Sequence, residues 1–236
     1  MLYDIAGLLV SCEGCGERFG RQAVPYISAR TDEPDVTVAV DEGDLAYALS
    51  RQILNEDDCR YMLSGMRFYF ELLPLGGLML HSSAVVVDGR AYLFSGPSGV
   101  GKSTHTGNWL KLLGDRAYIL NDDKPALRLI DGRFYACGTP WSGKNDISRN
   151  ELLPLAGICL IARDKTNWIE RVSGAEAVGL LISQTLRNIR AERMNILLEL
   201  LNRLIAEVPV FRLHCTADIA AAEVSYETMR REQDEN

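Results

Sequence analysis

The sequence lacks the features of a membrane, secreted or nucleic-acid-binding protein. None of its apolar runs reaches the ~18 residues that a membrane span needs. Its first ten residues carry one charge, Asp4, so the basic segment that opens a secretory signal is missing. Lysine and arginine number 25 against 32 acidic residues, and the formal net charge of -7 would repel polyanions. We therefore expect a cytoplasmic protein that binds neither membranes nor nucleic acids.

Cysteine is also scarce. Six cysteines over 236 residues are too few for a disulfide scaffold. Cys12 and Cys15 form a C-x-x-C pair, but no second close pair follows to complete a structural zinc site. We expect reduced, mostly buried thiols, and a turn at Gly14 and Gly16 instead of metal or redox chemistry.

What is present is the composition of a folded globular protein, with 47% hydrophobic and 24% charged residues and no internal repeat. Periodicity predicts strands at residues 36–40, 78–81, 84–87, 91–94, 117–120, 126–130, 133–137, 155–162 and 208–214. It predicts helices from about 57 to 73, from 173 toward Leu186, from 191 to 206 and from about 218. Helices and strands alternate, which indicates an α/β fold: a mixed β-sheet with flanking helices.

Local signals mark several ends of these elements. Asp57 and Asp58 are expected to cap the helix that follows them, and Ser173 with Glu176 forms a capping box. Asp-Gly pairs at 88–89 and 131–132 predict tight hairpin turns.

A glycine-rich segment fits the phosphate-loop pattern G-x-x-x-x-G-K-[ST], between an expected strand and an expected helix. Backbone amides of such a loop cradle phosphates, and the helix behind it adds the positive end of its dipole. We expect it to bind ATP, with Lys102 on the β- and γ-phosphates and the Ser103 hydroxyl on Mg²⁺. The nucleotide-binding residues predicted here are Gly96, Pro97, Ser98, Gly99, Val100, Gly101, Lys102, Ser103 and Thr104.

Two aspartates end the strand that follows this helix. Side chains alternate along a strand, so Asp122 and Asp123 should point in different directions, one toward the metal and the other toward the nucleophile. His81 ends an earlier strand, while His105 and His214 are read as structural. A loop around 138–144 contacts the acceptor, closes over phosphates, or is an ordinary turn between strands. Its candidate substrate residues are Trp141, Ser142, Gly143 and Lys144.

The sequence resembles the HPr kinase/phosphorylase-like kinases over about residues 78–175. The residues that carry the resemblance are the run HSSAVVVDGRAYLFSGPSGVGKST and the later N-D-D. The resemblance implies a nucleotide-binding core like that of phosphoenolpyruvate carboxykinases. It also implies that Asp123 is the proton acceptor, His81 its partner and Ser103 a Mg²⁺ ligand. Arg171 looks like the counterpart of the family's active-site arginine, and Arg163 is a second candidate.

The sequence departs from that family in two places. The metal-binding glutamate has no match near residues 135–138, so Asp122 is expected to take over that coordination. The C-terminal signature of the full HPr enzymes is missing around 186–193, which leaves the HPr substrate open. The loop at 138–144 and the stretch 208–213 look more like smaller HPr-kinase-related proteins, some of which modify serine on ribosomally made peptides.

These observations predict an ATP- and Mg²⁺-dependent kinase that phosphorylates a serine-type hydroxyl of a protein or peptide. Residues 1–72 would form an N-terminal α+β extension, separate from or continuous with a P-loop kinase core at 73–236, and the chain could form an oligomer. Two alternatives stay open: a small-molecule kinase that uses Arg187, Arg190 and Arg193, and a nucleotide-binding regulatory module without turnover. A regulatory GTPase is disfavoured because no N-K-x-D guanine motif is present.

Overall fold

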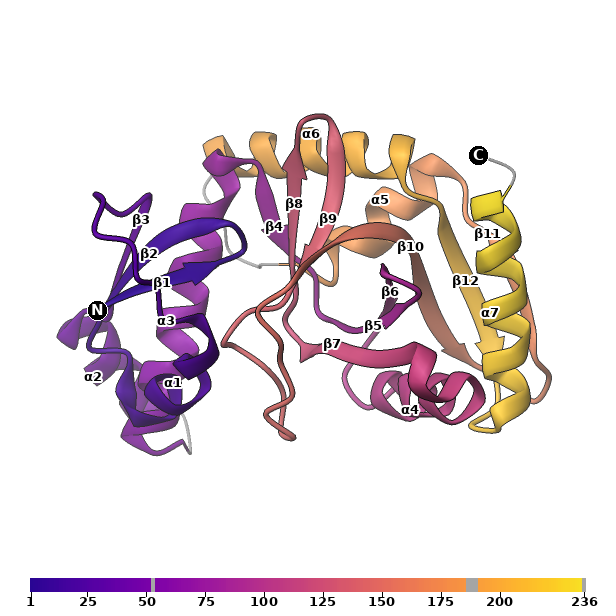
Figure 1. The fold of residues 1–236 in the computed structure, drawn as a ribbon, viewed down its shortest axis with the longest axis horizontal. Coiled ribbons are helices and arrows are strands. Elements are labelled where there is room, and N and C mark those ends of the chain that lie inside the picture. Colours follow the sequence, from indigo (N-terminus) through magenta and orange to yellow (C-terminus); the bar gives the residue numbers. More distant parts are fainter. Residues whose placement is uncertain (52–53, 186–190, 235–236) are drawn as a thin grey trace.

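The computed structural model describes residues 1–51, 54–185 and 191–234, and within them the strands form two sheets, one of three strands and one of nine (Figure 1). The α/β class expected from the sequence is confirmed. The smaller sheet has the order β1-β2-β3 and the larger the order β4-β8-β9-β10-β6-β5-β7, with β12 pairing to β10 and β11 to β12.

The N-terminal part contains β1 (Leu2–Ile5), β2 (Leu8–Glu13), α1 (Gly16–Gln22), β3 (Val36–Ala39), α2 (Glu42–Arg51) and α3 (Glu56–Leu72). The strands of the larger sheet are β4 (Gly77–Met79), β5 (Ser82–Val87), β6 (Arg90–Ser95), β7 (Ala117–Asp123), β8 (Ala126–Ile130), β9 (Arg133–Cys137), β10 (Leu152–Arg163), β11 (Trp168–Arg171) and β12 (Val210–Cys215). The helices that accompany it are α4 (Lys102–Leu113), α5 (Gly174–Ile182), α6 (Ala191–Glu207) and α7 (Ile219–Asp234).

Strand direction brings several strand ends to one edge of the larger sheet. β10 and β12 run parallel to each other, and β10 runs parallel to β6. β5 is antiparallel to both β6 and β7, with Ser82 opposite Ser95 on one side and Asp123 on the other. The carboxyl ends of β6, β7, β10 and β12 therefore meet the start of β5 at the same edge.

Two hydrophobic layers cover the faces of this sheet. Along β5, Ala84 and Val86 pack in a cluster with α5 and α6, whereas Val85 and Val87 pack in a cluster with α4 and α7. This is the alternation of side chains that a strand imposes, and here both faces are apolar because both are covered by helices. In Figure 1, α6 runs along the top of the molecule, α7 runs down its right side and α4 lies at the bottom, below β7.

A third cluster joins the N-terminal part to the larger sheet. Phe19 of α1 and Phe68 of α3 lie in it together with Met79 of β4, Cys137 of β9 and Trp141. The division at residue 72 stays a prediction, since side chains from both sides of it share this cluster.

The hairpin turns occur where the sequence predicts them, with Asp88 and Asp131 in the left-handed region, each before a glycine. The helix caps differ from those expected from the sequence. Asn55, not Asp57 or Asp58, caps α3 by accepting a 2.9 Å hydrogen bond from the Asp58 N–H. Asp57 instead accepts bonds from the first N–H groups of α1, at 2.5 Å from Glu17.

The predicted capping box of α5 is also wrong. Ser173 occupies the N-cap position, but its side chain makes no capping hydrogen bond. Glu176 is drawn away to Arg212 of β12, with 2.5 Å between the charged groups. Helix α5 ends at Ile182, before the predicted end at Leu186, which lies outside the described residues.

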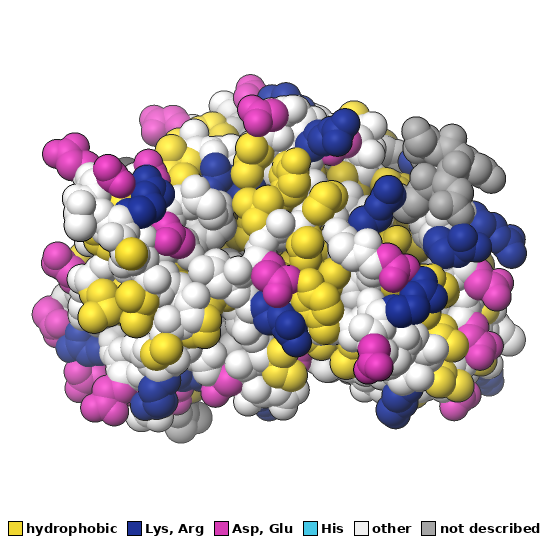
Figure 2. Space-filling model, viewed as in Figure 1, with side chains coloured by type: hydrophobic (Ala, Val, Ile, Leu, Met, Phe, Trp, Pro, Cys, Tyr) yellow, Lys and Arg dark blue, Asp and Glu magenta, His cyan; other side chains and the backbone are white. Residues whose placement is uncertain are grey.

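The cysteines of the chain are free thiols, and five of the six are buried. Among the described residues, no helix combines the length and the apolar character that a membrane crossing requires. Figure 2 shows acidic and basic side chains interspersed over the face it displays, with no single-sign patch across it.

Candidate functional site

The glycine-rich loop turns from the end of β6 directly into α4. Gly96, Gly99 and Gly101 have φ angles of 140°, 78° and 119°, which residues with a Cβ rarely adopt. The loop can therefore curl tightly and direct its amides toward one point, with the N-terminus of α4 immediately behind. The backbone of the loop therefore takes a conformation that depends on its glycines.

Lys102 lies across this loop. Its Nζ donates to the Gly96 carbonyl at 3.0 Å and to the Pro97 carbonyl at 3.3 Å. Burial lowers the pKa of Lys102, and the charges of Asp123 and Asp122 act in the opposite direction. A phosphate bound in the loop would supply a stronger partner for this ammonium group than the two carbonyls do.

A cavity of about 450 Å³, called here the loop cavity, lies between the glycine-rich loop and the ends of β5 and β7. Four segments supply its walls: the start of β5, the loop with the first turn of α4, the end of β7, and residues 143–145. The lining residues are His81, Ser83, Ser98, Gly99, Gly101, Lys102, Ser103, Thr104, Asp122, Asp123, Gly143, Lys144 and Asn145.

Asp122 is turned toward α4. The Ser103 hydroxyl donates to its Oδ1 at 2.9 Å, and the Asn145 amide donates to its Oδ2 at 3.3 Å. A hydroxyl and a carboxylate beside the glycine-rich loop are the hard oxygen donors that suit Mg²⁺, which usually completes its shell with water and substrate phosphates. The described residues contain no group of three or more His, Cys, Asp or Glu side chains that could enclose a metal alone.

Asp123 is turned the other way, toward β5. His81 Nε2 lies 3.2 Å from its Oδ1 and Lys124 Nζ lies 3.4 Å from its Oδ2. Burial would raise the pKa of Asp123, but the hydrogen bond from His81 and the charge of Lys124 outweigh it, and the pKa is lowered. Asp123 is therefore a carboxylate at neutral pH, able to accept a proton. The two aspartates point in different directions, as strand alternation requires.

Asn121 holds the end of β7 in place, a role that the sequence analysis did not assign. It is fully buried, and its Oδ1 accepts from the N–H groups of Asp123 (3.1 Å) and Lys124 (2.8 Å). Its amide donates to the Thr139 carbonyl at 3.0 Å. The sequence does contain a sign of this role, since Asn121 is a polar residue that follows an apolar strand and directly precedes the two aspartates.

Two of the four predicted substrate residues belong to the core instead. Trp141 is 1% exposed and stacks on Phe68 at 4.9 Å between ring centroids, while its Nε1 donates to the Ser64 hydroxyl at 3.0 Å. Ser142 is 2% exposed, and its N–H donates to the Tyr61 hydroxyl at 2.7 Å. Aromatic residues of α1 and α3, far from it in the chain, surround this tryptophan, and no local pattern in the sequence predicts that contact.

The other two, Gly143 and Lys144, do line the loop cavity. A Cβ on Gly143 would come within 2.4 Å of the Asp122 carbonyl, so this loop can pass over β7 only at a glycine. Arg18 of α1 ties the loop down from the N-terminal part, donating to the Gly143 carbonyl at 3.3 Å and to Asp146 at 3.0 Å. Arg18 and Asn145 are further site-forming residues that the sequence alone did not indicate.

Arg171 does not lie at the loop cavity. Strand β11 is antiparallel to β12, and Arg171 pairs with Phe211 near the start of β12, away from the edge where the glycine-rich loop lies. Its guanidinium forms an ion pair with Glu232 of α7. Arg163, at the end of β10, is the arginine that reaches the loop: it donates to the Val100 carbonyl at 3.1 Å and to the Gly99 carbonyl.

The remaining candidates do not line the loop cavity. His105 is buried and hydrogen-bonded to Ser225 at 3.0 Å, and His214 stacks on Trp168. Of the arginines that a small-molecule kinase would use, Arg187 and Arg190 lie outside the described residues. Arg193 is bound to Glu71 of α3 at 3.1 Å.

Of the comparisons with known proteins, the one with solved structures gives distant likenesses. No family model matches the chain, and no curated protein matches it. Among solved structures, it is similar to the Hpr(Ser) kinase/phosphatase from Coxiella burnetii, with 10% sequence identity and a TM-score of 0.37. The match covers 67% of this chain and 99% of that one.

Proposed function

We propose that this protein is an ATP-dependent phosphotransferase that moves the γ-phosphoryl group of ATP to a serine-type hydroxyl of a protein or peptide. One observation carries the proposal. A phosphate-loop sequence, a hydroxyl–carboxylate pair and a hydrogen-bonded His–Asp pair, drawn from separate segments, all line one cavity of about 450 Å³. Phosphoryl transfer needs these three elements together, for holding phosphates, for holding a metal and for accepting a proton.

The glycine-rich loop would hold the phosphate tail. Its amides and the N-terminus of α4 would bind the phosphate oxygens, and Lys102 would leave the Gly96 and Pro97 carbonyls to bind the β- and γ-phosphates. Arg163 already binds two loop carbonyls and would keep the loop in its curled form.

Ser103 and Asp122 would hold Mg²⁺, since their oxygens lie 2.9 Å apart beside the loop. A bound magnesium ion supplies positive charge that offsets the charge on the phosphate oxygens during transfer.

Asp123 would act as the general base. Its carboxylate would accept the proton of the acceptor hydroxyl while that oxygen bonds to the γ-phosphorus, and the bond from phosphorus to the β–γ bridging oxygen would break, releasing ADP. His81 would orient Asp123 through the 3.2 Å contact. Lys144 and Asn145 border the same cavity and would face the acceptor.

The test uses labelled ATP with serine-containing peptides and, separately, small alcohols. We expect transfer to peptide, and we expect Asp123→Asn to bind ATP normally but to transfer about a hundredfold to ten-thousandfold more slowly. Asp115→Asn, an exposed aspartate away from the cavity, is the matched control. Unchanged transfer in Asp123→Asn would contradict the assignment of the base. Labelling of alcohols alone would favour a small-molecule kinase, and ATP binding without turnover would favour a regulatory module.

A further inference from the structure

Cys12 and Cys15 form the one C-x-x-C segment of the chain, at the junction between β2 and α1. Gly14, which lies between them, has a φ angle of 65°, a left-handed value that lets the backbone turn tightly within the segment. The side chains of Cys12 and Cys15 are hydrogen-bonded to each other. The structure therefore brings two sulfurs into contact where the sequence analysis expected only a turn.

The two thiols differ in what can reach them. Cys12 is half-buried, whereas Cys15 is 5% exposed and its Sγ lies 3.4 Å from the Glu13 carbonyl oxygen. The hydrogen bond from Cys12 lowers the pKa of Cys15, although burial acts in the opposite direction, and the thiolate is the form that attacks another sulfur. A solute therefore meets Cys12 first, and Cys15 lies behind it in position to attack the Cys12 sulfur. An accessible cysteine beside a resolving one is the usual arrangement of a redox-active pair.

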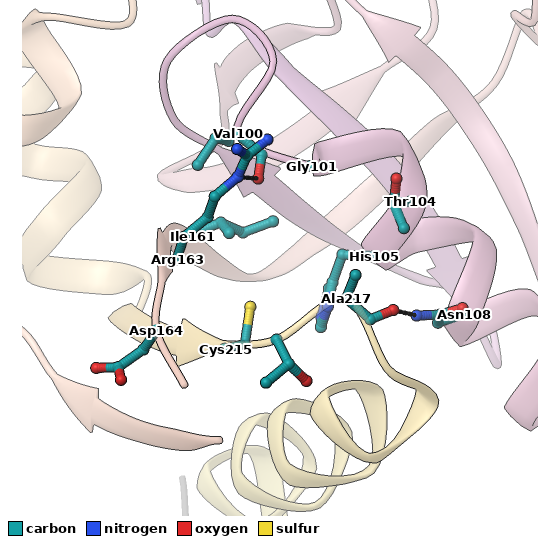
Figure 3. Close-up of a pocket in the computed structure, with 11 residues that line it drawn as sticks. Val100, Gly101, Thr104, His105, Asn108, Ile161, Arg163, Asp164, Cys215 and Ala217 are labelled. Atoms are coloured by element: carbon teal, nitrogen blue, oxygen red, sulfur yellow. Dashed lines mark hydrogen bonds between the residues drawn. The ribbon is translucent and has the colours of Figure 1, made fainter. Parts of the chain in front are cut away.

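The other four cysteines are protected by burial. Cys59, Cys137 and Cys159 are fully buried, and burial raises the pKa of Cys137 to about 12 and raises that of Cys159 as well. Cys215 faces a cavity of about 320 Å³ beside α4 (Figure 3), but burial raises its pKa too. Buried thiols that stay protonated are unreactive. The C-x-x-C pair is therefore where a thiol oxidant would act.

Cys15 lies beside the group that anchors the loop after β9. The hydroxyl of Ser64, on α3, is hydrogen-bonded to the Cys15 sulfur and accepts a 3.0 Å hydrogen bond from Trp141 Nε1. Trp141 leads into Gly143 and Lys144, which line the loop cavity. A movement of the Cys15 sulfur would therefore change the support of a loop that borders the proposed active site.

Helix α1 makes a second connection to the same loop. Arg18, three residues after Cys15, donates to the Gly143 carbonyl at 3.3 Å and pairs with Asp146 at 3.0 Å. Asp57 of α3 accepts hydrogen bonds from the first N–H groups of α1, so this end of the helix is held against α3. Both connections run from the C-x-x-C segment to residues 141–146.

We propose that Cys12 and Cys15 form a reversible disulfide with a small-molecule disulfide as the oxidant, and that this bond alters the loop that Trp141 anchors. The Cys12 thiolate attacks one sulfur of the oxidant, forms a mixed disulfide and releases the other sulfur as a thiolate, which takes up a proton. The Cys15 thiolate then attacks the Cys12 sulfur, forms the internal disulfide and expels the second thiolate, which is protonated in turn. Two protein thiols are oxidised, and one small disulfide is reduced to two thiols.

The bond changes the contacts of Cys15. The two sulfurs of a disulfide lie about 2 Å apart, closer than two sulfurs that share a hydrogen bond. Formation of the bond therefore draws Cys15 toward Cys12 and away from Ser64, which also holds Trp141. The disulfide itself does not depend on the proposed function, whereas its effect on peptide phosphorylation rests on it.

The first measurement detects the disulfide. The protein is equilibrated with oxidised glutathione, alkylated after unfolding and digested with trypsin. Arg18 is the first basic residue of the chain, so residues 1–18 leave as one peptide that holds both cysteines of the pair and no other. In the unmodified protein this peptide should lack two hydrogen atoms and take no alkyl group, and dithiothreitol should restore both alkylation sites. Cys215→Ser, the matched control, should behave in the same way, whereas Cys12→Ser should form no internal disulfide. Cys15→Ser replaces Cys12→Ser if circular dichroism shows that the latter is unfolded.

The second measurement follows the loop without using activity. The chain has three tryptophans, and the indole N–H resonance of Trp141 is identified by its loss in Trp141→Phe. Oxidation should shift this resonance in the unmodified protein, leave that of Trp168 in place, and shift neither in Cys12→Ser. Peptide phosphorylation by the oxidised protein should fall about tenfold in kcat/KM, because the loop beside the acceptor is displaced, with ATP binding unchanged.

The outcomes separate this proposal from the proposed function. Full alkylation of both cysteines in oxidised glutathione, or a glutathione adduct that persists on Cys12, would overturn the disulfide. A disulfide that leaves the Trp141 resonance unmoved would overturn its effect on the loop. If the disulfide forms and the resonance shifts but the reduced protein phosphorylates no peptide, the proposed function fails and the redox site stands.

Discussion

The contact between His81 and Asp123 leads to a prediction about the pH dependence of catalysis. His81 Nε2 lies 3.2 Å from the Asp123 carboxylate, and although burial would raise the pKa of Asp123, the His81 hydrogen bond is the largest of the effects that keep it lowered. A lowered pKa keeps Asp123, the proposed general base, charged to lower pH. Activity should therefore persist well below neutral pH and fall only as Asp123 becomes protonated.

Removal of the His81 side chain should raise the pH below which activity is lost. In His81→Leu, burial of Asp123 is opposed by Lys124 but no longer by His81, so the pKa of Asp123 rises. A hydrogen bond to a charged group contributes about 1.5–3 kcal/mol. The side chains of His81 and Asp123 are 30% and 27% exposed, so we take the lower end of that range, which corresponds to about one pH unit.

The assay is the pH profile of kcat/KM for peptide phosphorylation. We expect the acidic limb of His81→Leu to lie about one pH unit higher. We also expect kcat/KM at neutral pH, where Asp123 stays charged, to fall about tenfold because His81 no longer orients the carboxylate. His81→Gln, which retains a donor, should recover part of both effects. Titration of the substrate phosphates is common to all the proteins and cancels in the comparison. Superimposable acidic limbs for the unmodified protein and His81→Leu would refute the reasoning.

Two further predictions concern the metal and the core. Asp122→Asn should raise the Mg²⁺ concentration for half-maximal activity about tenfold, because it removes the charge of the proposed metal ligand. An unchanged Mg²⁺ requirement, measured by titration at fixed ATP, would argue against that role. Trp141→Ala should lower the free energy of unfolding in urea by about 3–5 kcal/mol, because it empties a buried aromatic site. Trp168→Ala, which removes a tryptophan that is 42% exposed, should lower it far less, and equal losses in the two variants would contradict the assignment of Trp141 to the core.

Local features of the structure were readable from the sequence because they depend on neighbouring residues. The turn from β6 through the glycine-rich loop into α4 is built from glycines with positive φ and a helix that starts at Lys102, all within one short segment. The hairpin turns at Asp88 and Asp131 and the opposite orientations of Asp122 and Asp123 likewise follow from backbone geometry over a few residues. The placement of His81 beside Asp123 agrees with what the resemblance implied, and both residues lie at neighbouring strand ends.

The tertiary structure decided the contacts between residues that lie far apart in the chain. Trp141 lies in a loop whose sequence fits a substrate loop and an ordinary turn equally well. Only the packing of Phe19 and Phe68 around it makes it a core residue. Arg171 and Arg163 were both candidates, and the antiparallel pairing of β11 with β12 carries Arg171 away from the loop, while the parallel pairing of β10 with β6 brings Arg163 to it. Periodicity and turn motifs report on a residue's neighbours in the chain; which strand lies beside which, and in what direction, is set by burial of the whole apolar surface.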